Sequence, residues 1–184
     1  MEAATLLSTV AFVALALAVV AFTRRAGRVL GETREAESFR RSIADLTGRA
    51  EQSLGAVSAR IDALRRHQVT APEIEPNVAA AIDAVARYAT EARGLRPPAA
   101  FVEHQTAIGA ELERAHRALE MVAHGCAILG DARPRGRELE AQTSIKRGYV
   151  NVLHARDAIT HQAAAVAVLR TPHEARAFVR RPSA

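Results

Sequence analysis

Beyond residue 38, apolar residues recur at alternating steps of three and four, the spacing that places side chains along one face of an α-helix. The first stripe consists of Phe39, Ile43, Leu46, Ala50, Leu54, Val57, Ile61 and Leu64. It predicts one helix that leaves the N-terminal segment and ends near His67. Residues 71–76, which include Pro72 and Pro76, predict a break after this helix.

Three further stripes follow, and each is bounded by turn-forming sequence. The second consists of Val78, Ile82, Val85, Ala89 and Ala92, and ends at Gly94 and the Pro97-Pro98 pair. The third consists of Phe101, Ile108, Leu112, Ala115, Leu119, Val122, Cys126 and Leu129, with Gln105 as its one polar member. Residues 130–136 predict a turn. The fourth stripe consists of Ile145, Tyr149, Val152, Arg156, Ile159, Ala163 and Val166.

Four amphipathic helices joined by short breaks predict an all-α protein with an antiparallel helical bundle. The 41 alanines agree with this prediction, because alanine is the strongest helix former. The seven aromatic residues and the β-branched residues show little alternation at period two, so strands find little support. The alternative is a parallel coiled-coil dimer through the first helix, with the other helices as a hairpin appendage.

The N-terminal segment has the length and composition of a membrane span. Residues 3–22 carry no charge, and 20 helical residues at about 1.5 Å each match a hydrocarbon core of about 30 Å. No Lys or Arg precedes this run and no small-x-small site follows it, which disfavours a cleaved signal peptide. Arg24, Arg25 and Arg28 come directly after it. The positive-inside rule therefore predicts a single-pass protein of the plasma (inner) membrane, with its N-terminus outside and its soluble domain cytoplasmic.

The predicted segments are a transmembrane anchor at 1–23, a basic collar and long amphipathic helix at 24–67, three further helices at 72–170 and a basic tail at 171–184. Residues 50–169 carry fourteen basic and fourteen acidic side chains, so the excess positive charge lies near the two ends of the chain. A neutral body argues against nucleic-acid binding, which more often needs a basic stripe.

The basic tail contains Arg176, Arg180 and Arg181. We expect it to contact anionic lipid headgroups together with the collar, because basic side chains gain free energy near them. A solvated terminus is the alternative.

Two pairs of residues raise the question of metal binding. Glu113 and His116 have the i, i+3 spacing of ferritin-like di-iron bundles, which need a second such pair. The nearest match, Asp157 and His161, has a spacing of four, and His154 shares their helix face. These faces lie beside or opposite the apolar stripes, so solvent exposure is the favoured interpretation and a metal site the alternative.

Arg156 and Gln105 interrupt apolar stripes. A buried, unpaired guanidinium is costly, so we expect Arg156 to pair with Glu111 on the third helix or to extend outward. In the alternative interpretation, Arg156 and Gln105 mark a polar contact for a partner or an anionic ligand. Cys126 lies in the third stripe, so we expect its side chain to be buried as a small hydrophobic group. It is the one cysteine of the sequence, which excludes an internal disulfide.

The sequence contains no Gly-rich phosphate loop, nucleophile elbow or Cys-x-x-Cys motif, and a single lysine, Lys146. We therefore expect no enzymatic activity and no cofactor. The favoured function is a membrane-anchored helical scaffold or adaptor whose protein partner the sequence does not name. Ala14 and Ala18 form a small-xxx-small pair that hints at homo-oligomerisation. The alternatives are a metal-binding, possibly redox, bundle and a helical subunit of a larger membrane complex.

Overall fold

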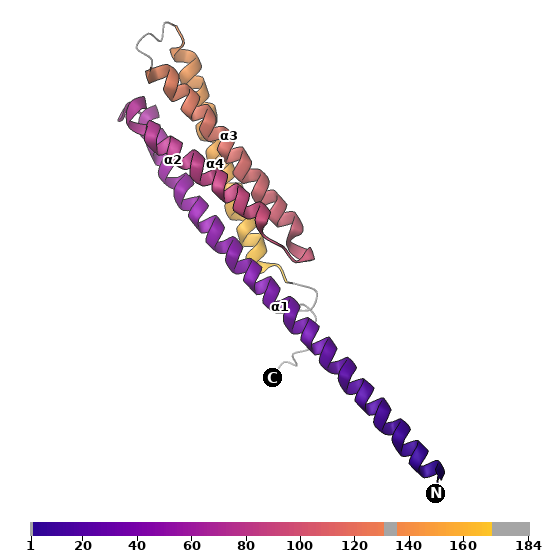
Figure 1. The fold of residues 1–184 in the computed structure, drawn as a ribbon. Coiled ribbons are helices and arrows are strands. Elements are labelled where there is room, and N and C mark those ends of the chain that lie inside the picture. Colours follow the sequence, from indigo (N-terminus) through magenta and orange to yellow (C-terminus); the bar gives the residue numbers. More distant parts are fainter. Residues whose placement is uncertain (1, 131–135, 171–184) are drawn as a thin grey trace. The chain divides into compact units, whose positions relative to one another are not determined.

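The computed structural model describes residues 2–130 and 136–170. These residues form the helices α1 (Glu2–Arg65), α2 (Ala71–Gly94), α3 (Val102–Gly130) and α4 (Glu138–Val168), with a short 3-10 helix, η1 (Ala99–Phe101), before α3 (Figure 1). No strand occurs in these ranges, so the prediction of an all-α protein is confirmed. The structure divides into a bundle, Phe39–Leu169, and a separate unit to which residues 2–38 and Arg170 belong.

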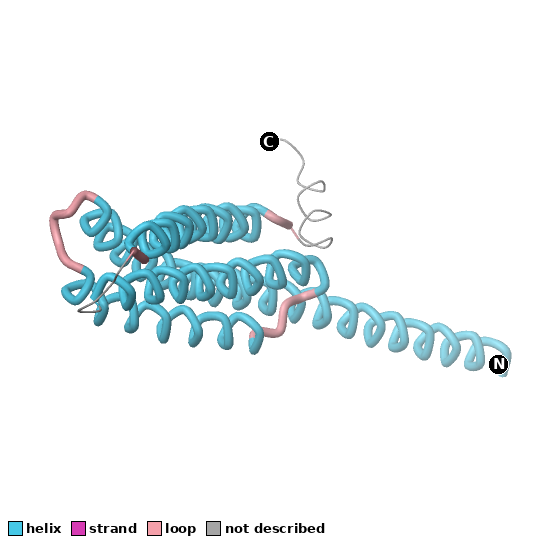
Figure 2. Tube along the Cα trace, turned by 90° about the horizontal axis from the view of Figure 1, so that it is seen from above, coloured by secondary structure: helices cyan, strands magenta, loops and turns pink. Residues whose placement is uncertain are grey.

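Within the bundle, the four helices lie side by side and neighbouring helices run antiparallel (Figures 1 and 2). Their register shows the alternation in direction. Arg49 and Ser53 of α1 contact Glu91 and Tyr88 of α2, in reversed order. In the same way, Ala118 of α3 faces Gly148 of α4, while Gly125 faces Ile145. The helical bundle predicted from the four stripes is confirmed.

The first stripe is buried inside this bundle. Its eight members, from Phe39 to Leu64, are 0–7% exposed. Helices of the same chain therefore cover the stripe. In the alternative, a parallel coiled-coil dimer, a second copy of the first helix would cover it. At its end, α1 stops at Arg65, two residues before the predicted His67.

The start of α2 corrects the predicted break. Residues 71–76 are helical, and the reversal of the chain lies just before them. The backbone N–H of Thr70 donates to the Glu73 carboxylate at 2.7 Å, closing a capping box. Pro72 lies in the first turn, where a missing N–H costs no helical hydrogen bond, and Pro76 follows one turn later. Both prolines therefore belong to α2, Pro72 in its first turn and Pro76 inside the helix, instead of separating two helices.

The earlier start extends the apolar stripe of α2. Its buried residues begin at Ala71 and Ile74 and continue through Val78 and Ala81. Ala81 takes a core position, while the predicted member Ile82 is half-buried. The buried face of α2 therefore has an alanine where the sequence pattern placed an isoleucine.

In α3 and α4, small residues bring the two helices close together. Gly125 and Gly148 are both buried at their interface. A Cβ on Gly148 would lie 2.6 Å from the carbonyl oxygen of Ala118, and one on Gly125 would lie 2.8 Å from that of Ala141. At this separation the backbones themselves are in contact, so the interface has no room for a methyl group.

For the N-terminal segment, the side chains of most residues of 3–22 lie outside those that the structure describes. Leu15, Leu17, Val19 and Val20 are described, and they are 46–65% exposed. No helix within the described residues is long and apolar enough to cross a membrane. The side chains of the predicted membrane-surface residues also lie outside the described set: Arg24, Arg25, Arg28, Arg176, Arg180 and Arg181.

Candidate functional site

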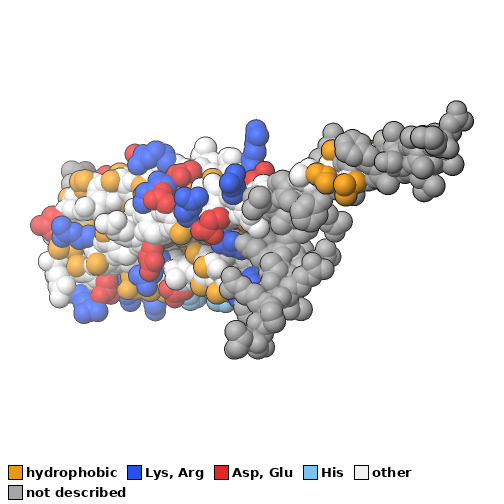
Figure 3. Space-filling view, turned by 90° about the horizontal axis from the view of Figure 1, so that it is seen from below, with side chains coloured by type: hydrophobic (Ala, Val, Ile, Leu, Met, Phe, Trp, Pro, Cys, Tyr) orange, Lys and Arg blue, Asp and Glu red, His pale blue; other side chains and the backbone are white. Residues whose placement is uncertain are grey.

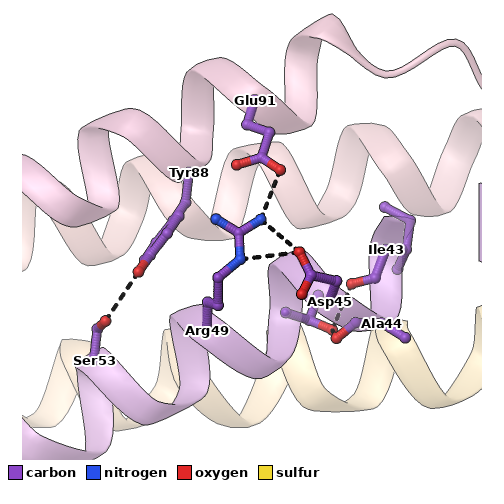
Figure 4. Close-up of polar contacts among 8 residues, drawn as sticks. Ile43, Ala44, Asp45, Arg49, Ser53, Tyr88 and Glu91 are labelled. Carbon is purple, nitrogen blue, oxygen red and sulfur yellow. Dashed lines mark hydrogen bonds and ion pairs between the residues drawn. The ribbon is translucent and has the colours of Figure 1, made fainter. Parts of the chain in front are cut away.

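A row of polar contacts joins α1 to α2 along one face of the bundle (Figure 4). Arg49 of α1 lies at its centre. Its Nη2 is 2.7 Å from Oε1 of Glu91 on α2, and its Nε donates to Oδ2 of Asp45 at 3.0 Å. The hydrogen bond to Glu91 raises the pKa of Arg49 above its ordinary value, with partial desolvation acting in the opposite direction. Arg49 therefore stays a cation that two carboxylates hold in place.

Tyr88 continues this row one helical turn further. The Arg49 guanidinium lies 5.4 Å from the centre of the Tyr88 ring, within the range of a cation–π contact. The Tyr88 hydroxyl is 3.2 Å from Oγ of Ser53, as Figure 4 shows. Asp45, Arg49 and Ser53 follow each other at steps of four, so they share one face of α1. This row, which we call the α1–α2 seam, consists of Asp45, Arg49, Ser53, Tyr88 and Glu91.

A hollow of about 270 Å³ opens on this face, next to the seam. Small side chains form most of its wall, and Ser53 links it to the seam. Its lining consists of Ser53, Ala56, Val57 and Arg60 from α1 and Asn77, Ala80, Ala81 and Ala84 from α2. The alanines of this lining leave space for side chains of a third helix, because nothing larger than a methyl group projects from them.

Arg60 and Asn77 supply the polar groups of the hollow. Both are exposed, one from each helix. Among the described side chains, none forms an ion pair with Arg60, whereas Arg49 on the same helix is held by two carboxylates. The hollow therefore offers a cation, a side-chain amide and the Ser53 hydroxyl beside an apolar floor, an arrangement suited to binding.

Of the residues considered for metal binding, Glu113 and His116 on α3 line one hollow together, and each of them has its own charged neighbour. Glu113 is 3.7 Å from Arg93 of α2, and His116 is 3.6 Å from Glu120. Asp157 is 3.5 Å from Arg156, and its side chain is 70% exposed.

His154 and His161 are exposed. Within residues 2–130 and 136–170, no three His, Cys, Asp or Glu side chains gather as metal ligands would.

Arg156 lies at the flank of its stripe. Ala155 takes the core position, and the Arg156 side chain is 34% exposed beside Asp157. Glu111, its expected partner, instead lies 3.1 Å from Arg114 one turn along α3. The core position that the stripe assigned to Arg156 is therefore held by the preceding residue of α4.

Gln105 has a structural role. Its amide donates to the carbonyl oxygen of Ala92 at 2.6 Å, in the last turn of α2. The last carbonyls of a helix have no partner within it, so the bond satisfies one of them. Nearby, His104 lies 2.7 Å from Gln162 across α3 and α4. The polar member of the third stripe thus fastens the end of a neighbouring helix.

Sequence patterns did not reveal the α1–α2 seam or its hollow. Arg49 and Glu91 are separated by 42 positions, and neither interrupts an apolar stripe. The one signal in the sequence is the i, i+4 spacing of Asp45 and Arg49, which is common on exposed helices.

Comparison of the chain with protein families, with curated proteins and with solved structures finds no match.

Proposed function

We propose that this protein is a non-enzymatic scaffold, anchored in the membrane by residues 3–22, that binds a helix of a partner protein in the hollow beside the α1–α2 seam. The observation that carries the proposal is the alanine-floored hollow with Arg60 at its edge. The partner's helix is acidic, because Arg60 has no ion-pair partner among the described residues and would gain one on binding.

The proposed anchor rests on the sequence. Residues 3–22 are uncharged over the length of a bilayer core, and Arg24, Arg25 and Arg28 follow them. An anchor of this kind would hold the bundle at the cytoplasmic face and raise the local concentration of any partner that binds there.

The α1–α2 seam supports a binding role through its rigidity. Side chains involved in fixed contacts lose little conformational entropy when a partner arrives. Arg49 is held by Asp45 and Glu91, and Tyr88 is held by Ser53 and by the Arg49 guanidinium. The wall of the hollow nearest the seam is therefore in place before binding.

Site-specific photocrosslinking in cells tests the proposal. A photoreactive residue at Ala80, which lines the hollow, should give a discrete adduct with an acidic protein. The same residue at Ala110, exposed on α3, should not. Arg60→Glu should reduce the Ala80 adduct at least fivefold, because it places a negative charge opposite the acidic helix; this is about 1 kcal/mol.

Two results would count against docking in the hollow. One is an adduct of equal yield from Ala80 and Ala110, which would indicate unspecific proximity. The other is an Ala80 adduct that Arg60→Glu leaves unchanged while the variant protein remains folded by circular dichroism. Arg117→Glu, which reverses the charge of an exposed arginine on α3, is the matched control and should leave the adduct at its original yield.

A further inference from the structure

A second hollow lies at the end of the bundle where α1 turns into α2 and α3 approaches α4. Its volume is about 330 Å³. Leu64 and Ile145 are buried at 7% and 3% exposure, and with half-buried Leu129 they supply its apolar lining. This hollow is separate from the one beside the α1–α2 seam, since the two share no lining residue.

The polar lining of this hollow is basic. Arg65, His67 and Lys146 all contribute to it beside the amide of Gln142, and among the described residues no acidic side chain does. Lys146 is the only lysine of the chain and is exposed. Within the described residues it forms no ion pair, so its ammonium group remains available to a ligand.

Arg65 is already positioned toward this end of the bundle. Its guanidinium lies 4.6 Å from the centre of the Tyr149 ring on α4 and 3.4 Å from Asp62. Asp62 also pairs with Arg66 at 2.7 Å, so a single carboxylate serves two guanidinium groups. The local charge around the hollow therefore stays positive.

His67 lines the hollow through an uncommon backbone conformation. Its φ is +57°, in the left-handed region that glycine usually occupies after a helix. The N–H of His67 bonds to the Leu64 carbonyl at 3.0 Å and that of Gln68 to the Ala63 carbonyl at 2.9 Å, the hydrogen-bond pattern of a Schellman motif. The folded protein is less stable with histidine at this position than it would be with glycine. In return, the histidine places an imidazole at the hollow.

We infer that this end hollow binds a small amphiphilic carboxylate, with the acyl or aryl part against Leu64, Leu129 and Ile145 and the carboxylate facing Lys146, Arg65 and His67. A floor of aliphatic side chains with a few convergent polar groups is the usual form of a small-molecule site. At about 30 Å³ for each water molecule of the liquid, the volume corresponds to about eleven water molecules, which is close to the size of octanoate with its about ten non-hydrogen atoms.

Methyl NMR of the full chain in neutral-lipid nanodiscs tests this inference with octanoate as the probe. Ile145 lines the hollow and its δ1-methyl serves as reporter, and the δ1-methyl of Ile159, buried elsewhere on α4, serves as internal reference. Octanoate should shift the Ile145 signal with saturation and leave the Ile159 signal unchanged. Octylammonium and acetate should not reproduce the shift at equal concentration, because one lacks the carboxylate and the other the apolar chain.

Three substitutions separate the roles of the basic residues. Lys146→Gln should weaken octanoate binding about three- to tenfold, the loss expected for one charge-assisted hydrogen bond. Arg147→Gln, an exposed neighbour that does not line the hollow, should leave the affinity unchanged. His67→Gly should weaken binding and also raise Tm by a few degrees, because glycine adopts the left-handed conformation without strain.

In His67→Gly the affinity for octanoate should fall while Tm rises, and this combination distinguishes a binding role of His67 from a structural one. Equal shifts from octanoate and octylammonium would overturn the inference, because the basic side chains would then contribute nothing. An unchanged affinity in Lys146→Gln would do the same. Absence of any Ile145 shift up to millimolar octanoate would show that the hollow binds no ligand of this class.

Discussion

The single cysteine shows how burial sets the properties of one side chain. Cys126 is 3% exposed in the core of the bundle. Burial raises the pKa of its thiol from 9.0 to about 11, and the negative charge of Glu75 contributes in the same direction. Only the thiolate reacts rapidly with disulfide reagents, so the folded protein holds this group in an unreactive form.

Two measurements follow for Cys126. A disulfide reagent at pH 8 should modify it only at the rate at which the bundle opens, and rapidly in denaturant. Because the folded-state pKa lies above the unfolded one, the stabilising contribution of the protonated thiol is complete below about pH 9 and is lost as the pH rises through about 11. Denaturant unfolding should therefore show a free energy that falls over this interval.

Cys126→Ala is the control for both measurements. It removes the titrating group, so its free energy of unfolding should fall less steeply between about pH 9 and 11 than that of the original protein. Modification of folded Cys126 at the rate measured in denaturant would contradict its position in the core.

At the scale of elements, the interface between α3 and α4 depends on the absence of side chains. Gly148 faces the backbone of α3, where a Cβ would lie 2.6 Å from the Ala118 carbonyl oxygen and 3.2 Å from the Val122 nitrogen. Backbone atoms of a packed helix cannot move aside as a flexible side chain can. The two helices would have to separate along this part of their length.

Gly148→Ala should therefore destabilise the bundle by about 1–3 kcal/mol, as overpacking does, despite the better helix propensity of alanine. Gly48→Ala is the matched control, since Gly48 lies within α1 and a Cβ there has no neighbour within 4 Å. It should stabilise the protein by about 0.5–1 kcal/mol. Denaturant unfolding measures both, and a stabilising Gly148→Ala would mean that α3 and α4 are further apart.

At the scale of the whole molecule, charge is distributed by segment. Residues 50–169 have equal numbers of basic and acidic side chains, and Figure 3 shows the two kinds intermixed over one face of the described residues. The net charge of +5 comes from the segments on either side, which include Arg24, Arg25 and Arg28. Orientation in a membrane depends on basic residues close to a span, and these three arginines directly follow the span proposed for residues 3–22.

The proposed orientation predicts the behaviour of fusion proteins. A reporter attached after residue 184 should be active if it requires the cytoplasm and inactive if it requires export. Replacing Arg24, Arg25 and Arg28 with Gln should reduce this preference, since the basic residues determine it. Activity of an export-dependent reporter on the unaltered chain would reverse the orientation.

The helices could be predicted from sequence because each carries its own periodic stripe. Burial of the whole first stripe, from Phe39 to Leu64, agrees with the pattern. The errors arose at positions where local signals have two interpretations. Pro72 can follow the end of one helix or lie in the first turn of the next, and the capping residues Thr70 and Glu73 favour the second interpretation.

What the sequence determined by itself is therefore the helical class, the number of amphipathic stripes and the distribution of charge, all of which depend on neighbours within a few residues. Tertiary structure alone decided which side chains meet between helices. Arg49 finds Glu91 and Arg65 stacks on Tyr149 because of the relative rotation and register of packed helices. A shift of one residue exchanges Arg156 for Ala155 in the core, since adjacent helical positions lie about 100° apart. Both hollows lie between helices and so belong to no single stretch of sequence.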